Sequence, residues 1–460
     1  MLLLLVKKVI KEKNFLSLTA NFFSAILGFT SFVFLVRSMD KDSFGEWVLF
    51  ITAATMVDLL RFGVTRVALT RYLSGVTGEE RKQFIGSSWA IGLGSILIVS
   101  VILYPIVLLF PHSIHASGFY YFFVWYPVLA LVSFPWGNAM SILQADERFG
   151  KILFLRVFNT GSFVVYLFFN YFFFKSPVVW VIIWFIITNS VSSIICTFYN
   201  WDGSRYIFKA SRTKNLITLK FGKFSMGTSI GSSLLKSADT FILGLSPFMG
   251  TVAVALYSIP IKFTEIIEIV LRAFTATAFP KLSKASIENN PDEFRKVFYA
   301  YSGALTLLLF PIAIISALFA REFVILLGGS QYKAFADGLS IIMFMFIIFS
   351  LLVPIDRFTG ISLDSINRPD KNFYKVVIMT SINILGDLIA VFLLPALFPS
   401  ISVMTVLIFV SVGSIFFQMA GLLTGFYLLN KEIPLKFTLI FKEGWNFYRE
   451  TYTYLKQKIL

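Results

Sequence analysis

FYYFFVWYPVLALVSFPWGNAMSILQ, residues 119–144, contains no charged side chain, and the polar stretch ADERFGK, residues 145–151, follows it directly. A helix of these 26 residues is long enough to cross a hydrocarbon core about 30 Å thick. Outward from it in both directions, similar apolar runs of roughly 20–28 residues alternate with short polar connections. Together they predict about twelve transmembrane helices, at about 15–36, 46–70, 85–110, 119–144, 152–174, 178–199, 224–246, 250–279, 297–320, 335–362, 374–397 and 400–429.

The positive charges in the connections alternate with the same period. Of 40 Lys and Arg, 28 fall on one predicted side of the membrane, in or near the two ends of the chain and the even-numbered connections. The other side holds five, which are Arg37, Lys41, Lys175, Arg321 and Lys333. Positive charge accumulates on the cytosolic side of membrane proteins. The sequence therefore predicts an all-α polytopic membrane protein with both termini in the cytosol.

Composition agrees with this class and excludes several functions. Hydrophobic residues make up 57% of the chain and charged residues 14%, against roughly 25% charged in soluble domains. The net charge of +15 is spread over the cytosolic connections, so it predicts no nucleic-acid partner. A single cysteine, Cys196, and two histidines, His112 and His115, provide neither a disulfide framework nor a metal cluster. The sequence lacks the phosphate-binding loop of nucleotide hydrolases, and its N-terminus does not match a cleavable signal peptide.

The basic connection at 200–223 divides the chain nearly in half. We expect a cytosolic basic N-terminus at 1–14, an N-lobe of six helices at 15–199, a cytosolic linker at 200–223 and a C-lobe of six helices at 224–429. The remainder, 430–460, is basic and rich in aromatic residues, which predicts an interfacial tail on the inner leaflet. Its aromatic residues include Trp445, Phe447, Tyr448, Tyr452 and Tyr454.

The two halves resemble each other weakly. A shift of 220 residues sets Arg148 and Lys151, after the fourth predicted span, on Arg368 and Lys371, after the tenth. A shift of 210 sets Asp58 on Glu268. Both lobes would run in the same direction through the membrane, as parallel repeats do. The alternative is that short apolar windows match by chance or share only loop chemistry.

Several basic residues lie inside the predicted spans, where a charge costs at least about 2.5–3.5 kcal/mol and normally faces the interior of the bundle or water. We expect them to line a wet, electropositive cavity between the lobes and to bind an anionic headgroup, because guanidinium and ammonium groups suit phosphate oxygens. The alternative is that each base pairs with a nearby acid and only holds helices together. The predicted anion-binding residues are Arg61, Lys236, Lys262, Arg272 and Arg357.

The carboxylates in the same spans are candidates for coupling to protons or sodium, because intramembrane acids mark ion pathways. The alternative is that they balance the neighbouring bases. The sequence predicts no other cofactor and no metal centre. The candidate coupling residues are Asp58, Asp239, Glu265, Glu268 and Asp387.

Four short motifs, in order along nearly the whole chain, carry a family resemblance. They are RSMDKDSFG at 37–45, QADERFG at 144–150, KSADTFILG at 236–244 and FPKLS at 279–283. With this order and spacing, the chain resembles the polysaccharide transporter (O-antigen flippase) family of the multidrug/oligosaccharidyl-lipid/polysaccharide exporter superfamily.

The resemblance implies two pseudo-symmetric six-helix lobes around a central V-shaped cavity, in a multi-pass protein of the bacterial cytoplasmic (inner) membrane. It implies a non-enzymatic flippase that moves a polyprenyl-pyrophosphate-linked oligosaccharide to the outer leaflet for O-antigen-like surface polysaccharide or lipopolysaccharide assembly. The implied partners are this lipid-linked substrate, membrane lipids and polysaccharide-assembly proteins. The alternatives are a drug exporter or a peptidoglycan-precursor flippase of the same superfamily, and then a membrane polymerase or ligase. The short outer loops argue against such an enzyme, and the mid-span bases favour an anionic substrate.

Overall fold

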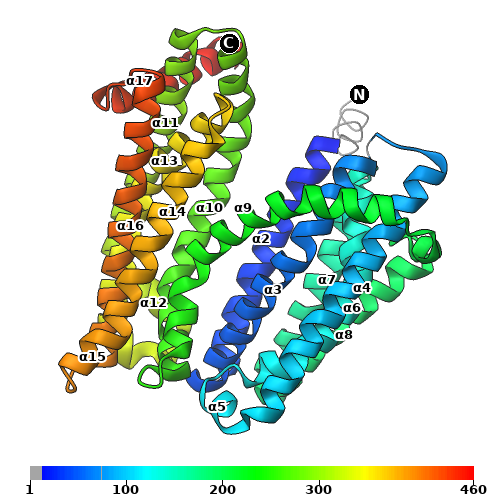
Figure 1. Cartoon of the computed structure of the whole chain (residues 1–460). Helices are drawn as coiled ribbons and strands as arrows, with labels where there is room; N and C mark the ends of the chain where they lie inside the picture. The colour runs from blue at the N-terminus through cyan, green and yellow to red at the C-terminus, as the bar shows by residue number, and fades with distance from the viewer. Residues whose placement is uncertain (1–12, 74, 460) are drawn as a thin grey trace. The chain divides into compact units, whose positions relative to one another are not determined.

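The computed structural model describes the backbone of residues 13–73 and 75–459, and every regular element in that part of the chain is a helix (Figure 1). The expected N-terminal segment 1–14 lies almost wholly outside the described residues. The helices are α2 (Lys13–Ser38), α3 (Lys41–Leu73), α4 (Gly78–Leu109), α5 (Pro111–Ala116), α6 (Tyr120–Ala145), α7 (Phe149–Phe169), η1 (Asn170–Phe174), α8 (Val178–Phe198), η2 (Ser204–Lys209), α9 (Arg212–Leu245), α10 (Gly250–Ile287), α11 (Pro291–Leu318), α12 (Ala320–Gly328), η3 (Ser330–Phe335), α13 (Ala336–Ser365), α14 (Pro369–Leu388), η4 (Ile389–Leu393), α15 (Leu394–Leu397), α16 (Val403–Glu432) and α17 (Thr438–Ile459).

Nine helical stretches of the described residues are long and apolar enough to span a membrane. They correspond to nine of the predicted runs, and the other three runs fall in α2, α9 and α10, which are also helices. In α10, four charged residues between Lys262 and Arg272 lower the mean hydropathy. The fold is therefore that of an all-helical polytopic membrane protein.

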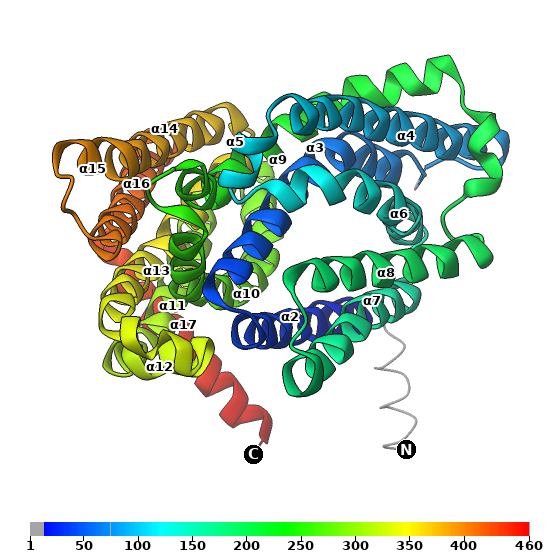
Figure 2. The ribbon, with the colours of Figure 1, turned by 90° about the horizontal axis from the view of Figure 1, so that it is seen from below.

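The chain forms two compact units. The N-terminal unit contains residues 1–233 and 250–255, and the C-terminal unit contains 234–249 and 256–460, so that α9 contributes to both. Within the N-terminal unit, α2 packs on α7, and α6 packs on α3, α4 and α8 (Figure 2). Within the C-terminal unit, α13 and α14 pack on α16, and α11 packs on α13 and α17.

The first part of the expected linker is folded onto the N-terminal unit. The backbone oxygen of Asp202 accepts hydrogen bonds from Trp89 Nε1 at 2.9 Å and from Asn138 Nδ2 at 2.8 Å. Helix η2 packs on α4 so closely that a Cβ at Gly86 would lie 2.4 Å from the backbone oxygen of Tyr206. Residues 202–209 are therefore part of the bundle, and α9 begins at Arg212.

Matching local geometry supports the predicted repeat. Glu147 and Asn367, 220 residues apart, both have positive φ, at 53° and 60°. In both turns, the next residue's N–H closes the helix end, from Arg148 to Leu143 O at 2.8 Å and from Arg368 to Leu363 O at 2.9 Å. The π-helical segments η1 and η4 also start 219 residues apart. The same turn geometry and the same π-helical irregularity therefore recur at nearly the same offset in both halves.

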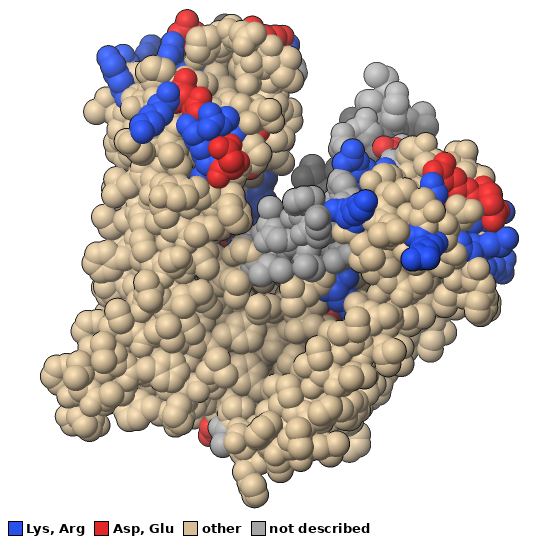
Figure 3. All heavy atoms as spheres, viewed as in Figure 1, with Lys and Arg blue, Asp and Glu red and all other residues tan. Residues whose placement is uncertain are grey.

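Charge is distributed unevenly along each unit. Most of the charged side chains visible in Figure 3 gather at one end of each unit, and the long flank shows few. Arg81, near the start of α4, and Asp146, after the end of α6, form a salt bridge at 2.6 Å, and Arg368, before α14, and Glu432, at the end of α16, form one at 2.5 Å. Large apolar side chains on the flanks are exposed, among them Leu97, Leu108, Phe173, Phe310 and Leu423. Such a belt is suited to lipid.

Helices α11 and α17 cross at Gly303 and Gly444, where the two backbones lie too close together for a side chain at either position. A Cβ at Gly303 would lie 1.9 Å from the backbone oxygen of Ile440, and a Cβ at Gly444 would lie 2.3 Å from the backbone carbon of Gly303. Because backbone cannot move aside as a flexible side chain does, we expect Gly303→Ala to lower stability by about 1–3 kcal/mol. Thermal unfolding of the purified protein measures this change. Gly413→Ala, where nothing lies within 4 Å, is the matched control and should leave the melting temperature unchanged.

Candidate substrate and ion sites

Three predicted bases meet on one carboxylate in the C-terminal unit. Glu268 of α10 contacts Arg357 Nη2 of α13 at 2.6 Å and Lys236 Nζ of α9 at 3.4 Å. Arg272 Nε, one turn further along α10, lies 3.7 Å from the same carboxylate. We call these four residues the Glu268 cluster.

The Glu268 cluster presents its cations rather than its acid. The side chain of Glu268 is 19% exposed, whereas those of Lys236, Arg272 and Arg357 are 57%, 72% and 43% exposed. Two arginines and a lysine carry thirteen N–H donors, far more than the two oxygens of one carboxylate accept. The cluster has a formal charge of +2, and Glu268 holds the three cations together. Such a cluster is able to bind a polyvalent oxyanion.

The remaining predicted base of α10 pairs locally. Lys262 Nζ lies 2.6 Å from Glu265 Oε2, one helical turn away. Lys262 is mostly covered, with 17% of its side chain exposed, whereas Glu265 is 60% exposed. The four charged residues of α10 from Lys262 to Arg272 thus divide between this pair and the Glu268 cluster.

Arg61 has a different environment in the N-terminal unit. Its guanidinium donates to Ala130 O at 2.5 Å and to Asp58 Oδ1 at 2.7 Å, and it lies 4.2 Å from the centre of the Phe62 ring. Tyr126 donates to the same Asp58 oxygen at 2.9 Å. Only 1% of the Arg61 side chain is exposed, so this group joins α3 to α6. Direct contact with a ligand would require Arg61 to exchange these partners.

Two predicted acids lie together in the interior of the C-terminal unit. Asp239 of α9 accepts hydrogen bonds from Tyr257 Oη at 2.6 Å, Asn383 Nδ2 at 2.9 Å and Ser414 Oγ at 3.2 Å. Asn383 also contacts Asp387 Oδ2 at 3.5 Å. All five residues are buried, and we call them the Asp239–Asp387 pocket.

The Asp239–Asp387 pocket is rich in oxygen and poor in positive charge. Among the residues that the structure describes, no Lys or Arg forms a salt bridge with either carboxylate. Asp387 Oδ1 and Asn383 Oδ1 are buried, and neither oxygen has a hydrogen-bond partner among the described residues. Two carboxylates, an amide oxygen and hydroxyls are ligands that suit a small hard cation or a proton.

Lys236 and Asp239 lie three residues apart on α9, a spacing that favours one helix face. The structure separates them, since Lys236 joins Glu268 and Asp239 faces the interior. The sequence did not predict Asn383 and Ser414 as members of the pocket. The spacing Asn383-x-x-x-Asp387 nevertheless places two polar groups on one face of α14.

A buried ion pair was also missed. Lys375, at the start of the predicted span 374–397, lies inside the C-terminal unit with Nζ 2.7 Å from Asp356 Oδ1 and 3.0 Å from Asp356 O. A Cβ at Gly425 would lie 2.9 Å from Lys375 Cδ, so glycine on α16 leaves the space that the lysine fills. The pair therefore ties α14 to α13 beside α16.

We expect Lys375→Met to destabilise the protein by about 3–5 kcal/mol, because it leaves the Asp356 carboxylate buried without its partner. Thermal unfolding of the purified protein would measure the loss. Asp356→Asn combined with Lys375→Met should recover most of it, since the double variant removes both charges. A double variant no more stable than the single one would show that the unpaired carboxylate is not the source of the loss.

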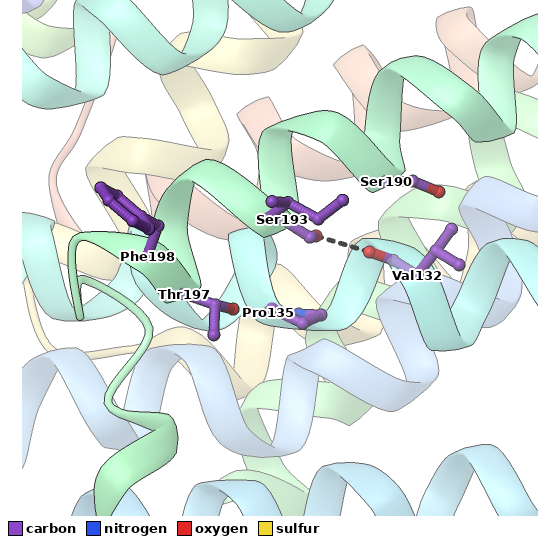
Figure 4. Close-up of a pocket in the computed structure, with 7 residues that line it drawn as sticks. Val132, Pro135, Ser190, Ser193, Thr197 and Phe198 are labelled. Carbon is purple, nitrogen blue, oxygen red and sulfur yellow. Dashed lines mark hydrogen bonds between the residues drawn. The ribbon is translucent and has the colours of Figure 1, made fainter.

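A groove on the N-terminal unit is apolar, in contrast to the charged Glu268 cluster. It encloses about 520 Å³ between α6 and α8, and Figure 4 shows Val132, Pro135, Ser190, Ser193, Thr197 and Phe198 around it. Ser193 Oγ donates to Val132 O at 2.5 Å, so that hydroxyl is satisfied within the wall. Without a charged residue in its lining, the groove suits a hydrocarbon chain rather than a headgroup.

The architecture is shared with solved transporters. An inward-facing multidrug resistance MATE family transporter of the MOP superfamily superimposes with a TM-score of 0.73 at 14% identity, covering 89% of this chain and 95% of that one. Lipid II flippase MurJ in an inward closed conformation gives a TM-score of 0.70 at 16% identity, covering 95% and 92%. A MOP superfamily transporter from Pyrococcus furiosus, described as having a binding pocket of reverse polarity, gives 0.53 at 13% identity, covering 92% and 96%. The chain therefore has a transporter fold.

A comparison of the sequence with protein-family models assigns the chain to a family. The family model described as "Polysaccharide biosynthesis protein" matches residues 94–337, more than half of the chain. The chain belongs to this polysaccharide biosynthesis protein family, which confirms the family resemblance of its motifs. No curated protein sequence matches it.

Proposed function

We propose that this protein is a flippase that moves a polyprenyl-pyrophosphate-linked oligosaccharide from the cytosolic to the outer leaflet of the bacterial inner membrane. The observation that carries this proposal is the Glu268 cluster, where Lys236, Arg272 and Arg357 present exposed cations within helices of a transporter fold. The family assignment supports a role in polysaccharide biosynthesis. We further propose twelve spans, cytosolic termini, a central cavity and contacts with polysaccharide-assembly proteins.

The physical problem in this reaction is the headgroup. A bare pyrophosphate cannot enter hydrocarbon, because burying unpaired charge costs many kcal/mol. Arginine forks and a lysine ammonium in place of water remove most of that barrier. An inside-negative membrane potential assists export by about 2.3 kcal/mol per negative charge and 100 mV. Lys262 lies six residues before Glu268 on α10 and is proposed to extend the cluster.

The saccharide and the lipid tail call for different surroundings. We propose that the tail stays in the bilayer while the two units rock about the bound headgroup, as alternating access requires. The apolar groove between α6 and α8 offers one lipid-facing position for a hydrocarbon chain. Arg61 would join the headgroup site only after exchanging Asp58 and Ala130 O for substrate oxygens.

We also propose that the Asp239–Asp387 pocket binds the coupling ion, a proton or sodium. Its support is two buried carboxylates without a Lys or Arg partner among the described residues, together with two unpaired oxygens. Asp58 and Glu268 serve this role less well, since Arg61 and the Glu268 cluster already neutralise them. Glu265 pairs with Lys262 in the same way.

Reconstitution tests the proposed substrate. Proteoliposomes would carry a fluorescent polyprenyl-pyrophosphate oligosaccharide, and a membrane-impermeant reductant would measure how fast the label changes leaflet. We expect the pyrophosphate-linked lipid to move and an otherwise identical neutral polyprenyl glycoside to stay. Movement of the neutral lipid at the same rate would contradict the assigned role of the Glu268 cluster.

Parallel substrates separate the alternatives. Faster movement of a peptidoglycan precursor would make the protein a flippase of that class, and uptake of a cationic dye with no lipid movement would make it a drug exporter. Chain extension of the oligosaccharide by the reconstituted protein would instead indicate a polymerase or ligase. Since the cluster is positively charged, we expect the dye to be a poor substrate.

A further inference from the structure

The C-terminal helix α17 presents two different aromatic faces. One face packs on α11, where Tyr448 Oη donates to Ala304 O at 2.8 Å and the Phe447 ring lies 5.5 Å from that of Tyr301. The other face carries an exposed stripe of Phe441, Trp445 and Tyr452, which Phe437, the residue before the helix, extends. Phe447 and Tyr448, which the sequence predicts in an interfacial tail, therefore pack against protein. The exposed stripe takes their place as the aromatic surface of the tail.

The stripe is narrow and continuous. At 100° per residue its three members on α17, Phe441, Trp445 and Tyr452, fall within an arc of about 40°, and Phe437 directly precedes the helix. Trp445 and Tyr452 are 68% and 69% exposed, and Phe437 and Phe441, at 43% each, contact one another edge to face. Three large aromatic residues on one helix face, with Phe437 beside them, indicate a surface that meets a partner or a membrane.

Charges are ordered around the same helix. Lys442 and Arg449 follow the stripe on the side away from α11, about 40–60° beyond its edge. Glu443 and Glu450 lie further round, on the face most distant from the stripe. The order is therefore apolar, basic, acidic, which matches hydrocarbon, lipid phosphate and water in succession.

The crossing point places α17 at a specific depth. The last charged residue of α11 before its apolar stretch is Lys296, and Gly303 of the crossing is seven residues further along. Seven residues of helix correspond to about 10 Å. A helix at this distance below the charged end lies at the boundary between headgroups and acyl chains. Its start is fixed there as well, because Lys436 N–H donates to Tyr299 Oη at 2.6 Å.

We propose that α17 is an in-plane membrane anchor that inserts its aromatic stripe into the inner leaflet and binds anionic phospholipid headgroups through Lys442 and Arg449. The stripe supplies burial, since aromatic residues favour this interface. The two cations select anionic lipid, because each basic residue near such a surface strengthens binding about fivefold. Through the crossing at Gly303 and Gly444, the anchor holds α11 at the same level in the membrane.

The depth of Trp445 tests the anchor in the full-length protein. With the buried Cys196 replaced by alanine, Trp445→Cys and, separately, Glu450→Cys would carry a polarity-sensitive fluorophore in nanodiscs. We expect brominated lipid to quench the label at 445 at least about twofold more than at 450, and aqueous iodide to show the reverse order. Equal iodide quenching at both positions would overturn the insertion.

A second comparison tests the lipid headgroup. Nanodiscs of phosphatidylcholine alone and of phosphatidylcholine with phosphatidylglycerol would be compared at low and high salt. We expect phosphatidylglycerol to deepen the label at 445, and Lys442→Gln with Arg449→Gln to abolish that difference while Lys284→Gln preserves it. No effect of phosphatidylglycerol on the parent would reject headgroup binding. Protection of 445 only after cell extract is added would identify the stripe as a protein-binding surface and overturn the proposal.

Discussion

Arg357→Gln should lower the rate at which the pyrophosphate-linked lipid changes leaflet by roughly ten- to a hundredfold, because a charge-assisted hydrogen bond contributes about 1.5–3 kcal/mol. Arg357 is the cluster member closest to Glu268, at 2.6 Å, and it is contributed by α13 rather than by α10. Its loss therefore removes one cation and also the link between these two helices. Transport in proteoliposomes and surface polysaccharide in cells would both measure the effect.

The matched control for this prediction is Arg321→Gln. Arg321 also forms a close pair with a carboxylate, at 2.8 Å from Asp337, but it lies in the short helix α12 away from the cluster. We expect it to transport at the parental rate. If Arg357→Gln transported as fast as Arg321→Gln at equal protein abundance, the Glu268 cluster would not be the headgroup site.

Glu268→Gln separates the two roles within the cluster. A cluster that only joins helices would lose stability and keep its substrate affinity in the folded fraction. A cluster that binds an anion would gain one net positive charge. We expect this variant to bind pyrophosphate more tightly and to transport the lipid more slowly, because release of the anion becomes slower. Binding of inorganic pyrophosphate to the purified variant, measured by calorimetry, would distinguish these outcomes.

The membrane class followed from sequence because hydrophobic length and loop charge are strong, local signals. The run at 119–144 lies in α6 nearly end to end, and the runs at 297–320 and 400–429 lie in α11 and α16. The repeat offset of 220 was also visible in sequence, because a polar turn such as Gln144–Lys151 must solve the same backbone problem in both halves. Such features depend on near neighbours in the chain.

The partners of the intramembrane charges did not follow from sequence. Spacing along one helix predicts which residues share a face, but the partner of Lys236 is on α10 and that of Lys375 is on α13. Tertiary packing decides these pairs, and a single sequence contains no record of it. The tail shows the same limit, since only contact with α11 distinguishes Phe447 and Tyr448 from the exposed Trp445.

Asp387→Asn should abolish the response of the protein to its coupling ion while leaving the fold intact. Asp239 accepts three hydrogen bonds and is part of the packing, whereas Asp387 has a long contact with Asn383 at 3.5 Å and an oxygen without a hydrogen-bond partner among the described residues. A ligand that binds only the folded state stabilises it, by about 2.7 kcal/mol at a hundred times its dissociation constant. We therefore expect sodium, or a lower pH if the ion is a proton, to raise the melting temperature of the parent and not of the variant.

The same variant predicts a change in transport that separates the ion site from the headgroup site. Asp387→Asn should flip lipid at a rate that no longer depends on a sodium or proton gradient, and should still bind inorganic pyrophosphate, because the Glu268 cluster is unaltered. Asp337→Asn is the matched control, since its side chain is 87% exposed and pairs only with Arg321 among the described residues. A parent protein that responds to neither ion, in melting temperature or in transport, would show that the Asp239–Asp387 pocket is structural. The membrane potential would then be the remaining driving force, because export of a negatively charged headgroup moves down it without a coupling ion.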